Sequence, residues 1–464
     1  MAEPLWTSDE ILAASGGRLE GAPFACGGIS IDSRAIAFGD LFVALTAERD
    51  GHAFVAAAFE QGAAGALVSQ AGPGPRVIVP DTLQALAQMG AAARDRAAGA
   101  RRGAVTGSVG KTSLTQAILA GLKRAGQAHG SVKSFNNHIG VPLTLARMPK
   151  ATRRAVFEIG MNHAGEIAPL TRLVRPHAVA ITNVGPVHIE NFADGEAGVA
   201  RAKAEIFEGI AAGGLAVLNA DNRWFEILSA AARAKGAEVA AFGVGSACDA
   251  QLVDFAAQDS GARVKARLRG REIEIVLRQT GAHWGLMSLA ALLMMEALGV
   301  GLDDSLTALA SFDPLEGRGA EKAVALAGGA FTLVDESYNA NPVSVAAALR
   351  TLGLRPTAGR RIVVLTDMLE LGPDASAYHA ALAAEIEAAK VDAVFCAGPL
   401  MEALWQALPP CRRAGYAQTA ADLVPLATAA VAPGDVVMVK GSKASNAWTV
   451  AAALAGLKRA GEAG

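Results

Sequence analysis

Eight consecutive residues have the types and the order that hold the phosphates of a nucleotide. They are Thr106, Gly107, Ser108, Val109, Gly110, Lys111, Thr112 and Ser113, and they lie between a short apolar stretch (103–105) and a segment with helical spacing (114–119). In a strand–loop–helix arrangement, backbone N–H groups and the helix N-terminus surround the phosphates. Lys111 can then reach the β- and γ-phosphates, and the Thr112 hydroxyl can bind Mg²⁺. A glycine turn followed by a chance Gly-Lys-Thr is the alternative interpretation.

Three further polar residues lie close to predicted strands or helices and could complete a metal site. Glu158 ends the apolar run 155–158, and His188 follows the run 178–183 at a Gly-Pro turn. Ligands bind outside the carboxyl ends of parallel strands, so both side chains are candidate ligands of Mg²⁺. A solvated strand-end glutamate and a structural histidine are the alternatives. Lys203 lies in a helical stretch, where an exposed lysine is the simpler interpretation, because a free ammonium repels Mg²⁺.

Two segments further along the chain carry groups suited to phosphate or to dense hydrogen bonding. Arg318 lies between glycines, and an arginine can make bidentate contact with a phosphate. The segment 335–342 (Asp-Glu-Ser-Tyr-Asn-Ala-Asn-Pro) follows a predicted strand and precedes a helix. An ordinary helix-capping turn is the alternative interpretation of this second segment.

The composition predicts a chain with full-sized cores and excludes several classes of protein. Of the 464 residues, 52% are hydrophobic and 19% are charged, with a net charge of −2, so we expect neither disorder nor nucleic-acid binding. We also expect no signal peptide and no membrane span. The four cysteines are far apart, without C-x-x-C spacing, and are predicted to be reduced, buried thiols of a cytosolic protein: Cys26, Cys248, Cys396 and Cys411.

Short apolar runs alternate with helical patterns, which predicts an α/β fold. We expect three domains: a small N-terminal α/β domain (1–98), a central parallel-sheet domain that carries the phosphate loop (99–317) and a C-terminal Rossmann-like α/β domain (318–464). The predicted strands are 41–44, 65–68, 77–79, 155–158, 178–183, 331–334, 361–365, 393–395 and 436–439. Alternation around Arg269 and Gly270 predicts a hairpin over 262–277.

Together these segments resemble the Mur ligase family, the ATP-dependent amide-forming enzymes of peptidoglycan assembly. The resemblance covers nearly the whole chain, and its segments are 106–113, 136–142, 158–162, 182–188, 219–221, 338–342 and 368–372. Within the family the chain is similar to the ligase (EC 6.3.2 type) that joins D-alanyl-D-alanine to UDP-N-acetylmuramoyl-tripeptide through an acyl phosphate in the cytoplasm. Segments 182–188 and 338–342 separate it from the ligase that adds the third amino acid.

The resemblance also implies roles for individual residues. It assigns catalysis to Lys111, Lys203, His188 and Arg318, and two Mg²⁺ ions to Thr112, Glu158, His188 and a carbamylated Lys203. It implies that ATP is bound by residues 107–113 with Asn183, His283, Arg318 and Asp335, which holds the ribose. The substrate-binding residues it implies are Ser33 and Arg34 in a UDP-sugar-binding N-terminal domain, then Asn136, Asn137, Tyr338, Asn339 and Asn341. The C-terminal domain would close on ATP and bind the incoming dipeptide.

The chain departs from the family pattern at one position. The family has His-Asn in a Gly-x-His-Asn segment near the adenine, whereas residues 281–284 read Gly-Ala-His-Trp. The adenine contact of that Asn has no counterpart here. Trp284 is expected either to pack within the protein or to stack on the adenine, and His283 remains available as an adenine contact.

Other functions stay open at this point. A P-loop switch or motor NTPase is one, although the chain has neither an Asn-Lys-x-Asp segment nor a Leu-Ser-Gly-Gly-Gln segment. A related ligase, such as a folylpolyglutamate synthetase, is another, and residues 338–342 argue against it. Both meso-diaminopimelate and L-lysine stay open as the third residue of the tripeptide, and we expect a monomer.

Overall fold

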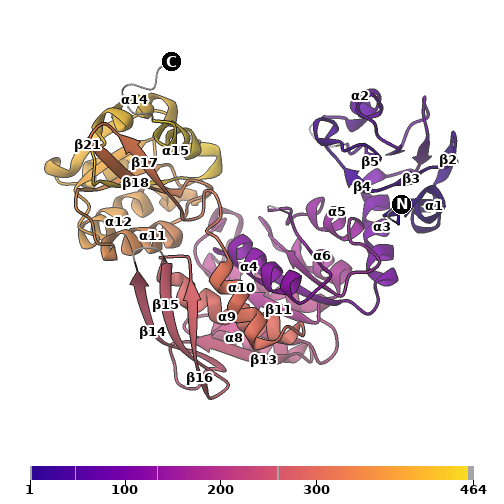
Figure 1. Ribbon diagram of the computed structural model, residues 1–464, viewed down its shortest axis with the longest axis horizontal. Coiled ribbons are helices and arrows are strands. Elements are labelled where there is room, and N and C mark those ends of the chain that lie inside the picture. The colour runs from indigo at the N-terminus through magenta and orange to yellow at the C-terminus, as the bar shows by residue number, and fades with distance from the viewer. Residues whose placement is uncertain (1–2, 47–48, 133, 259–260, 458–464) are drawn as a thin grey trace.

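The computed structural model describes residues 3–46, 49–132, 134–258 and 261–457. Three sheets with their own helices follow one another along the chain, and the central unit lies between the other two (Figure 1). The α/β fold that the sequence predicts is confirmed. The proposed domain limits fall between elements: helix α3 (Thr82–Arg96) precedes strand β8 (Arg101–Thr106), and helix α10 (Leu302–Ser311) precedes strand β17 (Ala320–Leu326).

The N-terminal unit is a five-stranded sheet with strand order β2-β7-β6-β5-β4 and a separate β1-β3 pair. Strands β4 to β7 are parallel to their neighbours, and β2 is antiparallel to β7. The strands are β1 (Trp6–Thr7), β2 (Arg18–Glu20), β3 (Ala25–Cys26), β4 (Gly28–Ser30), β5 (Asp40–Val43), β6 (Gly65–Val68) and β7 (Arg76–Ile78). The helices are α1 (Ser8–Ser15), α2 (Val55–Glu60) and α3.

The N-terminal unit is joined to the central one by shared core and by hydrogen bonds. Leu143 and Ala146 belong to the same buried cluster as the N-terminal side chains. Trp6 Nε1 donates to the Ala146 carbonyl at 2.8 Å, and Arg147 donates to the Ile29 carbonyl. These contacts lie in and beside helix α5 (Gly140–Ala146), which packs on α3.

The central sheet has nine strands in the order β16-β15-β14-β13-β12-β11-β8-β10-β9, with the phosphate-loop strand β8 third from the β9 edge. Strands β8 to β14 pair in parallel, and β14, β15 and β16 form an antiparallel extension. The remaining strands are β9 (Ala128–Gly130), β10 (Arg154–Glu158), β11 (Ala178–Ile181), β12 (Leu215–Asn219), β13 (Glu238–Gly243), β14 (Ala250–Gln258), β15 (Gly261–Leu268) and β16 (Arg271–Leu277). The helices are α4 (Lys111–Arg124), α5, α6 (Ile167–Val174), α7 (Glu196–Ala204), α8 (Phe225–Ala234), α9 (His283–Ala297) and α10.

The predicted hairpin is confirmed, and a third antiparallel strand joins it. Arg269 and Gly270 both have positive φ, +45° and +83°, as the tight turn between β15 and β16 requires. Strand β14 had no prediction, because its outer half is exposed and its residues do not alternate clearly.

The C-terminal sheet has six strands in the order β17-β18-β22-β19-β20-β21, parallel except for β17. The strands after β17 are β18 (Gly329–Glu336), β19 (Arg361–Thr366), β20 (Ala393–Ala397), β21 (Arg413–Ala417) and β22 (Val436–Lys440). The helices are α11 (Pro342–Leu354), α12 (Ala375–Ala388), α13 (Met401–Ala407), α14 (Ala420–Ala430) and α15 (Ala447–Ala455). The four predicted strands of this unit correspond to β18, β19, β20 and β22.

The cysteine prediction is partly wrong. Cys26 and Cys396 are buried, but Cys248 is half-buried and Cys411 is exposed. All four are free thiols. Cys411 lies in a short 3₁₀ turn (Pro410–Arg412) on the surface, so the general preference of cysteine for the core does not apply there. In the described part of the chain, every helix is too short or too polar to cross a membrane.

Candidate active site

A cavity of about 720 Å³ lies where the central and C-terminal units meet. Fifteen of the residues predicted for the site line it: Ser108, Val109, Gly110, Lys111, Thr112, Ser113, Asn136, Glu158, Asn183, His188, His283, Arg318, Tyr338, Asn339 and Asn341. Residues of the phosphate loop therefore face residues that lie about 200 positions later in the chain.

The segment after β11 holds the phosphate loop in shape. Asn183 Oδ1 accepts a hydrogen bond from the Val109 N–H at 3.0 Å. Ser108 Oγ donates to the Gly185 carbonyl at 3.1 Å and accepts from the Gly185 N–H at 3.0 Å. Asn183, predicted as an ATP contact, thus supports the loop itself and also lines the cavity.

Lys111 lies at the N-terminus of α4 and is turned toward its own loop. Its Nζ donates to the Gly107 carbonyl at 2.8 Å. Burial lowers the pKa of Lys111; the Glu158 charge opposes that shift, and the Arg318 charge adds to it. In such surroundings a nearby phosphate anion strongly stabilises the charged ammonium, as the predicted phosphate contact of Lys111 requires.

Glu158 ends β10 and has one carboxylate oxygen without a partner. Oε1 accepts from Asn136 Nδ2 at 2.6 Å, while the buried Oε2 has no hydrogen-bond partner among the described residues. A buried carboxylate oxygen of this kind is costly unless a cation or a donor reaches it. Glu158 therefore has the chemistry of a magnesium ligand.

Ser134 is a cavity residue that the sequence reasoning missed. Its Oγ lies 3.0 Å from Thr112 Oγ1 and accepts from Arg318 at 3.3 Å. Arg318 in turn stacks on the Tyr338 ring, with its guanidinium carbon 4.0 Å from the ring centre. A hydroxyl of the central unit thus connects the phosphate loop to an arginine of the C-terminal unit. A serine in an irregular segment has no spacing signal by which a sequence could reveal this role.

His188 contacts a carboxylate of the other unit. Its Nδ1 forms an ion-pair contact with Glu370 Oε2, in the loop that follows β19. Burial lowers the pKa of His188, against the opposing effect of Glu370. Both residues have positive φ, 56° for His188 and 62° for Glu370. Glu370 is the second functional candidate without a predicted role, although it lies in a segment, 368–372, that carries the family resemblance.

Lys203 is buried, so its simpler interpretation as an exposed helix lysine is wrong. It lies near the C-terminal end of α7 and is 3% exposed. Burial and then the charge of Lys111 lower the pKa of Lys203 well below its ordinary value. Within the described chain its Nζ makes no hydrogen bond or ion pair. It does not line the cavity of the phosphate loop.

The segment 335–342 combines cavity wall and helix cap. The Asn341 side chain caps α11 by accepting from the Ser344 N–H at 2.9 Å. The Asn339 carbonyl accepts from Lys440 Nζ at 3.0 Å, and Lys440 also pairs with Glu336 at 3.1 Å. Asp335, predicted to hold the ribose, instead accepts from Ser337 and does not line the cavity, whereas Glu336 does.

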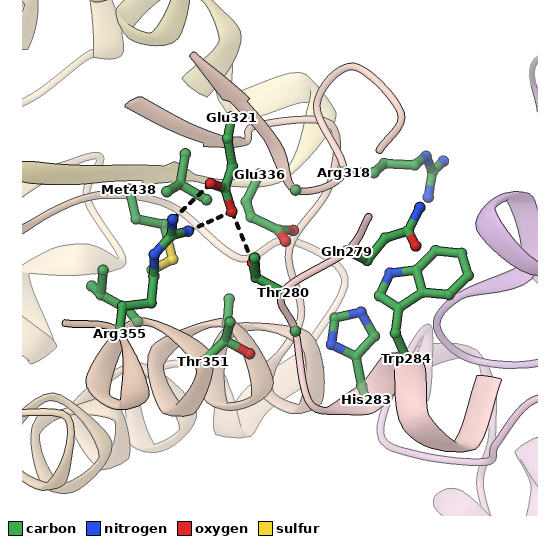
Figure 2. A pocket seen from close by; sticks show the side chains of 15 residues that line it. Gln279, Thr280, His283, Trp284, Arg318, Glu321, Glu336, Thr351, Arg355 and Met438 are labelled. Atoms are coloured by element: carbon green, nitrogen blue, oxygen red, sulfur yellow. Dashed lines mark hydrogen bonds and ion pairs between the residues drawn. The ribbon is translucent and has the colours of Figure 1, made fainter. Parts of the chain in front are cut away.

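A second, much smaller cavity of about 30 Å³ lies beside the first, between residues 279–284 and the C-terminal unit (Figure 2). Trp284 is buried there and packs on Phe312, with ring centres 5.7 Å apart. Trp284 thus packs against the protein interior in this structure and also lines the small cavity. His283, in contrast, is exposed and lines both cavities.

Figure 2 also shows how the two units are connected at this point. Glu321 of β17 accepts from Thr280 Oγ1 at 2.8 Å and from Arg355 Nη2 at 2.6 Å. Thr280 belongs to the central unit, and Arg355 follows helix α11 of the C-terminal unit. One carboxylate thus connects the two units in the wall of the small cavity.

Three predicted substrate residues lie outside the cavity. Ser33 and Arg34 are in a 3₁₀ turn of the N-terminal unit, where Arg34 makes a bidentate contact with Asp32. Asn137 is exposed and accepts from the Gly140 N–H at 2.9 Å at the start of α5. Gly107 forms the base of the phosphate loop and does not itself line the cavity.

The donors that surround the cavity fit magnesium better than a transition metal. In the ranges that the structure describes, no three His, Cys, Asp or Glu side chains gather at one point. Magnesium binds through one or two carboxylates and keeps water and phosphate oxygens as its other ligands. The unpartnered Glu158 oxygen and the nearby Thr112 hydroxyl suit that pattern.

Known proteins match both the sequence and the fold. The family described as "Mur ligase middle domain" matches residues 105–295, and "Mur ligase, glutamate ligase domain" matches residues 323–443. The UDP-N-acetylmuramoyl-tripeptide--D-alanyl-D-alanine ligase of Bacillus subtilis (strain 168) is 34% identical over 379 residues, 80% of each chain. The ligase of that name from Escherichia coli (strain K12) is 35% identical over 393 residues, 84% of this chain and 85% of that one. A crystal structure of MurF from Acinetobacter baumannii has a TM-score of 0.85 and 28% identity, covering 98% of this chain and 99% of that one.

Proposed function

The chain belongs to the Mur ligase family, and on that premise we propose that it joins D-alanyl-D-alanine to UDP-N-acetylmuramoyl-tripeptide in an ATP-dependent reaction. The observation that carries this proposal is the shared cavity, in which the phosphate loop faces Arg318 of the C-terminal unit. The relatives that are 34% and 35% identical carry this reaction in their names. The reaction belongs to peptidoglycan biosynthesis, and we place it in the cytoplasm.

The first step activates the tripeptide. An oxygen of its terminal carboxylate attacks the γ-phosphorus of ATP, and the bond between that phosphorus and the β-phosphate oxygen breaks. ADP is released, and the tripeptide carries an acyl phosphate. Lys111 and the loop N–H groups bind the phosphate oxygens, and Arg318 reaches them from the opposite wall. The positive charges stabilise the negative charge of the transferred phosphoryl group.

The second step forms the amide. The amine of D-alanyl-D-alanine attacks the acyl carbon, phosphate leaves, and the nitrogen loses a proton. The cavity side chains of the C-terminal unit, Tyr338, Asn339 and Asn341, are placed to bind substrate on the side opposite the phosphate loop. Ser33 and Arg34, on the N-terminal unit, are proposed to bind the UDP end of the tripeptide substrate. The three units must therefore come together around one substrate.

Magnesium supplies charge neutralisation at the phosphates when it is bound. Thr112, Glu158 and His188 are the residues that would hold it, and two ions are part of the proposal. Lys203 would join them as a carbamate, which forms when its neutral amine attacks CO₂ and loses a proton. The buried surroundings that favour the neutral amine support this modification.

His283 is proposed to contact the adenine from the cavity wall, and Asp335 is kept as a proposed ribose ligand. Asp335 would have to leave its hydrogen bond with Ser337 to reach a ribose, because it does not line the cavity. We also propose that the chain acts as a monomer.

The proposal is tested by phosphate release from Mg²⁺-ATP together with the mass of the product. Release is expected only when a UDP-muramoyl-tripeptide and D-alanyl-D-alanine are both present. Separate reactions with the meso-diaminopimelate and the L-lysine tripeptide identify the third residue. Release that needs neither substrate would refute the ligase assignment, and nucleotide-dependent partner binding without a product would support an NTPase switch.

A matched pair of variants connects the activity to the phosphate loop. Lys111→Ala removes the loop ammonium and is expected to abolish phosphate release. Lys123→Ala changes an exposed lysine on the same helix, α4, and should leave the rate unchanged.

A further inference from the structure

The contact between His188 and Glu370 joins two units at the edge of the active-site cavity. His188 follows β11 in the central unit, and Glu370 follows β19 in the C-terminal unit. His188 Nδ1 lies within ion-pair distance of Glu370 Oε2, but the two groups are not aligned as a hydrogen bond in this arrangement. A small rotation of the ring or of the half-exposed Glu370 side chain lets an Nδ1–H donate to the carboxylate. The other ring nitrogen, Nε2, is then left unprotonated, which is the form that binds a metal.

The surrounding loops also pack against each other. A Cβ atom on Gly372 would lie 3.4 Å from the Glu190 Cβ, so these backbones are at van der Waals distance. A Cβ atom on Gly185 would lie 2.9 Å from a Val343 methyl group. Segment 185–190 thus packs against both the start of α11 and segment 370–372, and the His188–Glu370 pair lies at this junction.

Stability alone does not explain this pair. The Glu370 side chain is 52% exposed, and a half-exposed ion pair contributes little to the free energy of unfolding. Both residues nevertheless adopt left-handed backbone, which is unfavourable for residues other than glycine. Strained backbone of this kind is common at functional sites, where the function requires a particular side-chain position despite the conformational strain.

We propose that Glu370 is a positioning residue for the metal site: it holds the His188 imidazole with its proton on Nδ1 and Nε2 free for the metal. A carboxylate behind a metal-binding histidine fixes the tautomer and the ring orientation in many proteins. Here that carboxylate comes from another domain, so docking of the C-terminal unit completes the site. The inference rests on the proposed function in one respect, the assignment of His188 as a metal ligand.

The test measures metal affinity and does not depend on turnover. Mn²⁺ replaces Mg²⁺, and electron paramagnetic resonance measures its binding to the full chain with a non-hydrolysable ATP analogue. Glu370→Ala is expected to weaken Mn²⁺ binding by about 10- to 100-fold, the usual effect of removing such a carboxylate. Glu370→Gln keeps an acceptor oxygen and should lose less Mn²⁺ affinity than Glu370→Ala. Glu387→Ala removes an exposed carboxylate of α12 and should change nothing.

Glu370→Gly separates a folding defect from a binding defect. Glycine adopts the left-handed conformation without steric cost, so this variant should keep its melting temperature while losing Mn²⁺ affinity as Glu370→Ala does. ¹⁵N spectra of the histidine-labelled protein give the tautomer directly. His188, identified through a His188→Gln variant, should show Nδ1–H in the parent chain and a shift toward Nε2–H in Glu370→Ala.

The outcomes distinguish the inference from the proposed function. If His188→Ala weakens Mn²⁺ binding but all three Glu370 variants bind like the parent chain, the inference is overturned and the metal role of His188 stands. If His188→Ala also binds like the parent chain, the metal role of His188 fails and the inference fails with it. An unchanged His188 tautomer in Glu370→Ala would overturn the positioning role directly.

Discussion

Gly107 and Thr182 approach so closely that a Cβ atom on Gly107 would lie 1.8 Å from Thr182 Oγ1. Thr182 Oγ1 also donates to the Val109 carbonyl at 2.5 Å, so the threonine cannot move without losing a loop contact. The φ angle of Gly107 is +147°, a conformation that residues with a side chain rarely adopt. The first glycine of the phosphate loop is therefore required both by space and by backbone conformation.

Gly107→Ala is expected to deform the phosphate loop and to weaken binding of an ATP analogue by at least about tenfold, equivalent to roughly 1.4 kcal/mol. Isothermal titration with the analogue measures this loss. Gly99→Ala is the matched control, because a Cβ atom there meets nothing within 4 Å. Equal affinity in Gly107→Ala and the parent chain would contradict the steric argument.

Ser134→Ala is expected to lower kcat/KM for ATP by about tenfold, because it removes the hydroxyl that hydrogen-bonds with both Thr112 and Arg318. A hydrogen bond of this kind contributes about 1 kcal/mol, and more when the donor is charged. Steady-state phosphate release measures the effect. Ser134→Thr keeps the hydroxyl and should retain most of the activity, and Ser311→Ala, at the exposed end of α10, should retain all of it. A Ser134→Thr variant as impaired as Ser134→Ala would show that side-chain size, not the hydroxyl, matters.

Stability should fall below neutral pH because of a half-buried histidine in strand β9. Burial lowers the pKa of His129 to about 4, and its Nε2–H donates to the Thr144 carbonyl at 2.7 Å. The unfolded chain binds the proton near pH 6.5, so the contribution of His129 is complete above that pH and is lost as the pH falls toward 4. Between pH 7 and pH 5 the loss amounts to about 2 kcal/mol.

Urea unfolding at pH 7 and pH 5 shows whether the free energy of unfolding falls as the pH is lowered. The free energy of unfolding of His129→Gln should depend less on pH than that of the parent chain. His163→Gln changes an exposed histidine and should keep the parent dependence. A His129→Gln variant that loses as much stability between the two pH values as the parent chain would exclude His129 as the cause.

The sequence predicts those parts of the molecule that depend on neighbouring residues or on the common edge of parallel strands. The phosphate loop is contiguous, so its residue types alone place Lys111 and Thr112. Glu158 and His188 follow strands of one sheet, and parallel strands bring their carboxyl ends together. The hairpin at Arg269 and Gly270 follows from two residues that accept positive φ.

Contacts between units are beyond such reasoning. Ser134 and Glu370 act across a domain junction, and neither residue has a spacing that indicates its partner. Strand β14 is largely exposed, so its apolar pattern is too weak to detect. Asn137 and Asn341 are predicted as substrate ligands, and both side chains also accept backbone N–H groups at helix starts, a second role that the residue type alone does not indicate. The role proposed for Lys203 depends on its burial. A lysine in a helical stretch is usually exposed, so the sequence does not reveal that this one is buried.

Lys203 should carry a carbamate when CO₂ is present, because its amine is buried and its pKa is lowered well below the ordinary value. A neutral amine attacks CO₂, whereas an ammonium cannot, so the modification is favoured at neutral pH where exposed lysines remain charged. In ¹³C-bicarbonate the full chain should show one carbamate carbon signal, and Lys203→Met should lose it together with ligase activity. Lys390→Met, an exposed lysine after α12, should keep both. Full activity in CO₂-free buffer, with no carbamate signal, would mean that Lys203 acts as an unmodified amine or only as a structural residue.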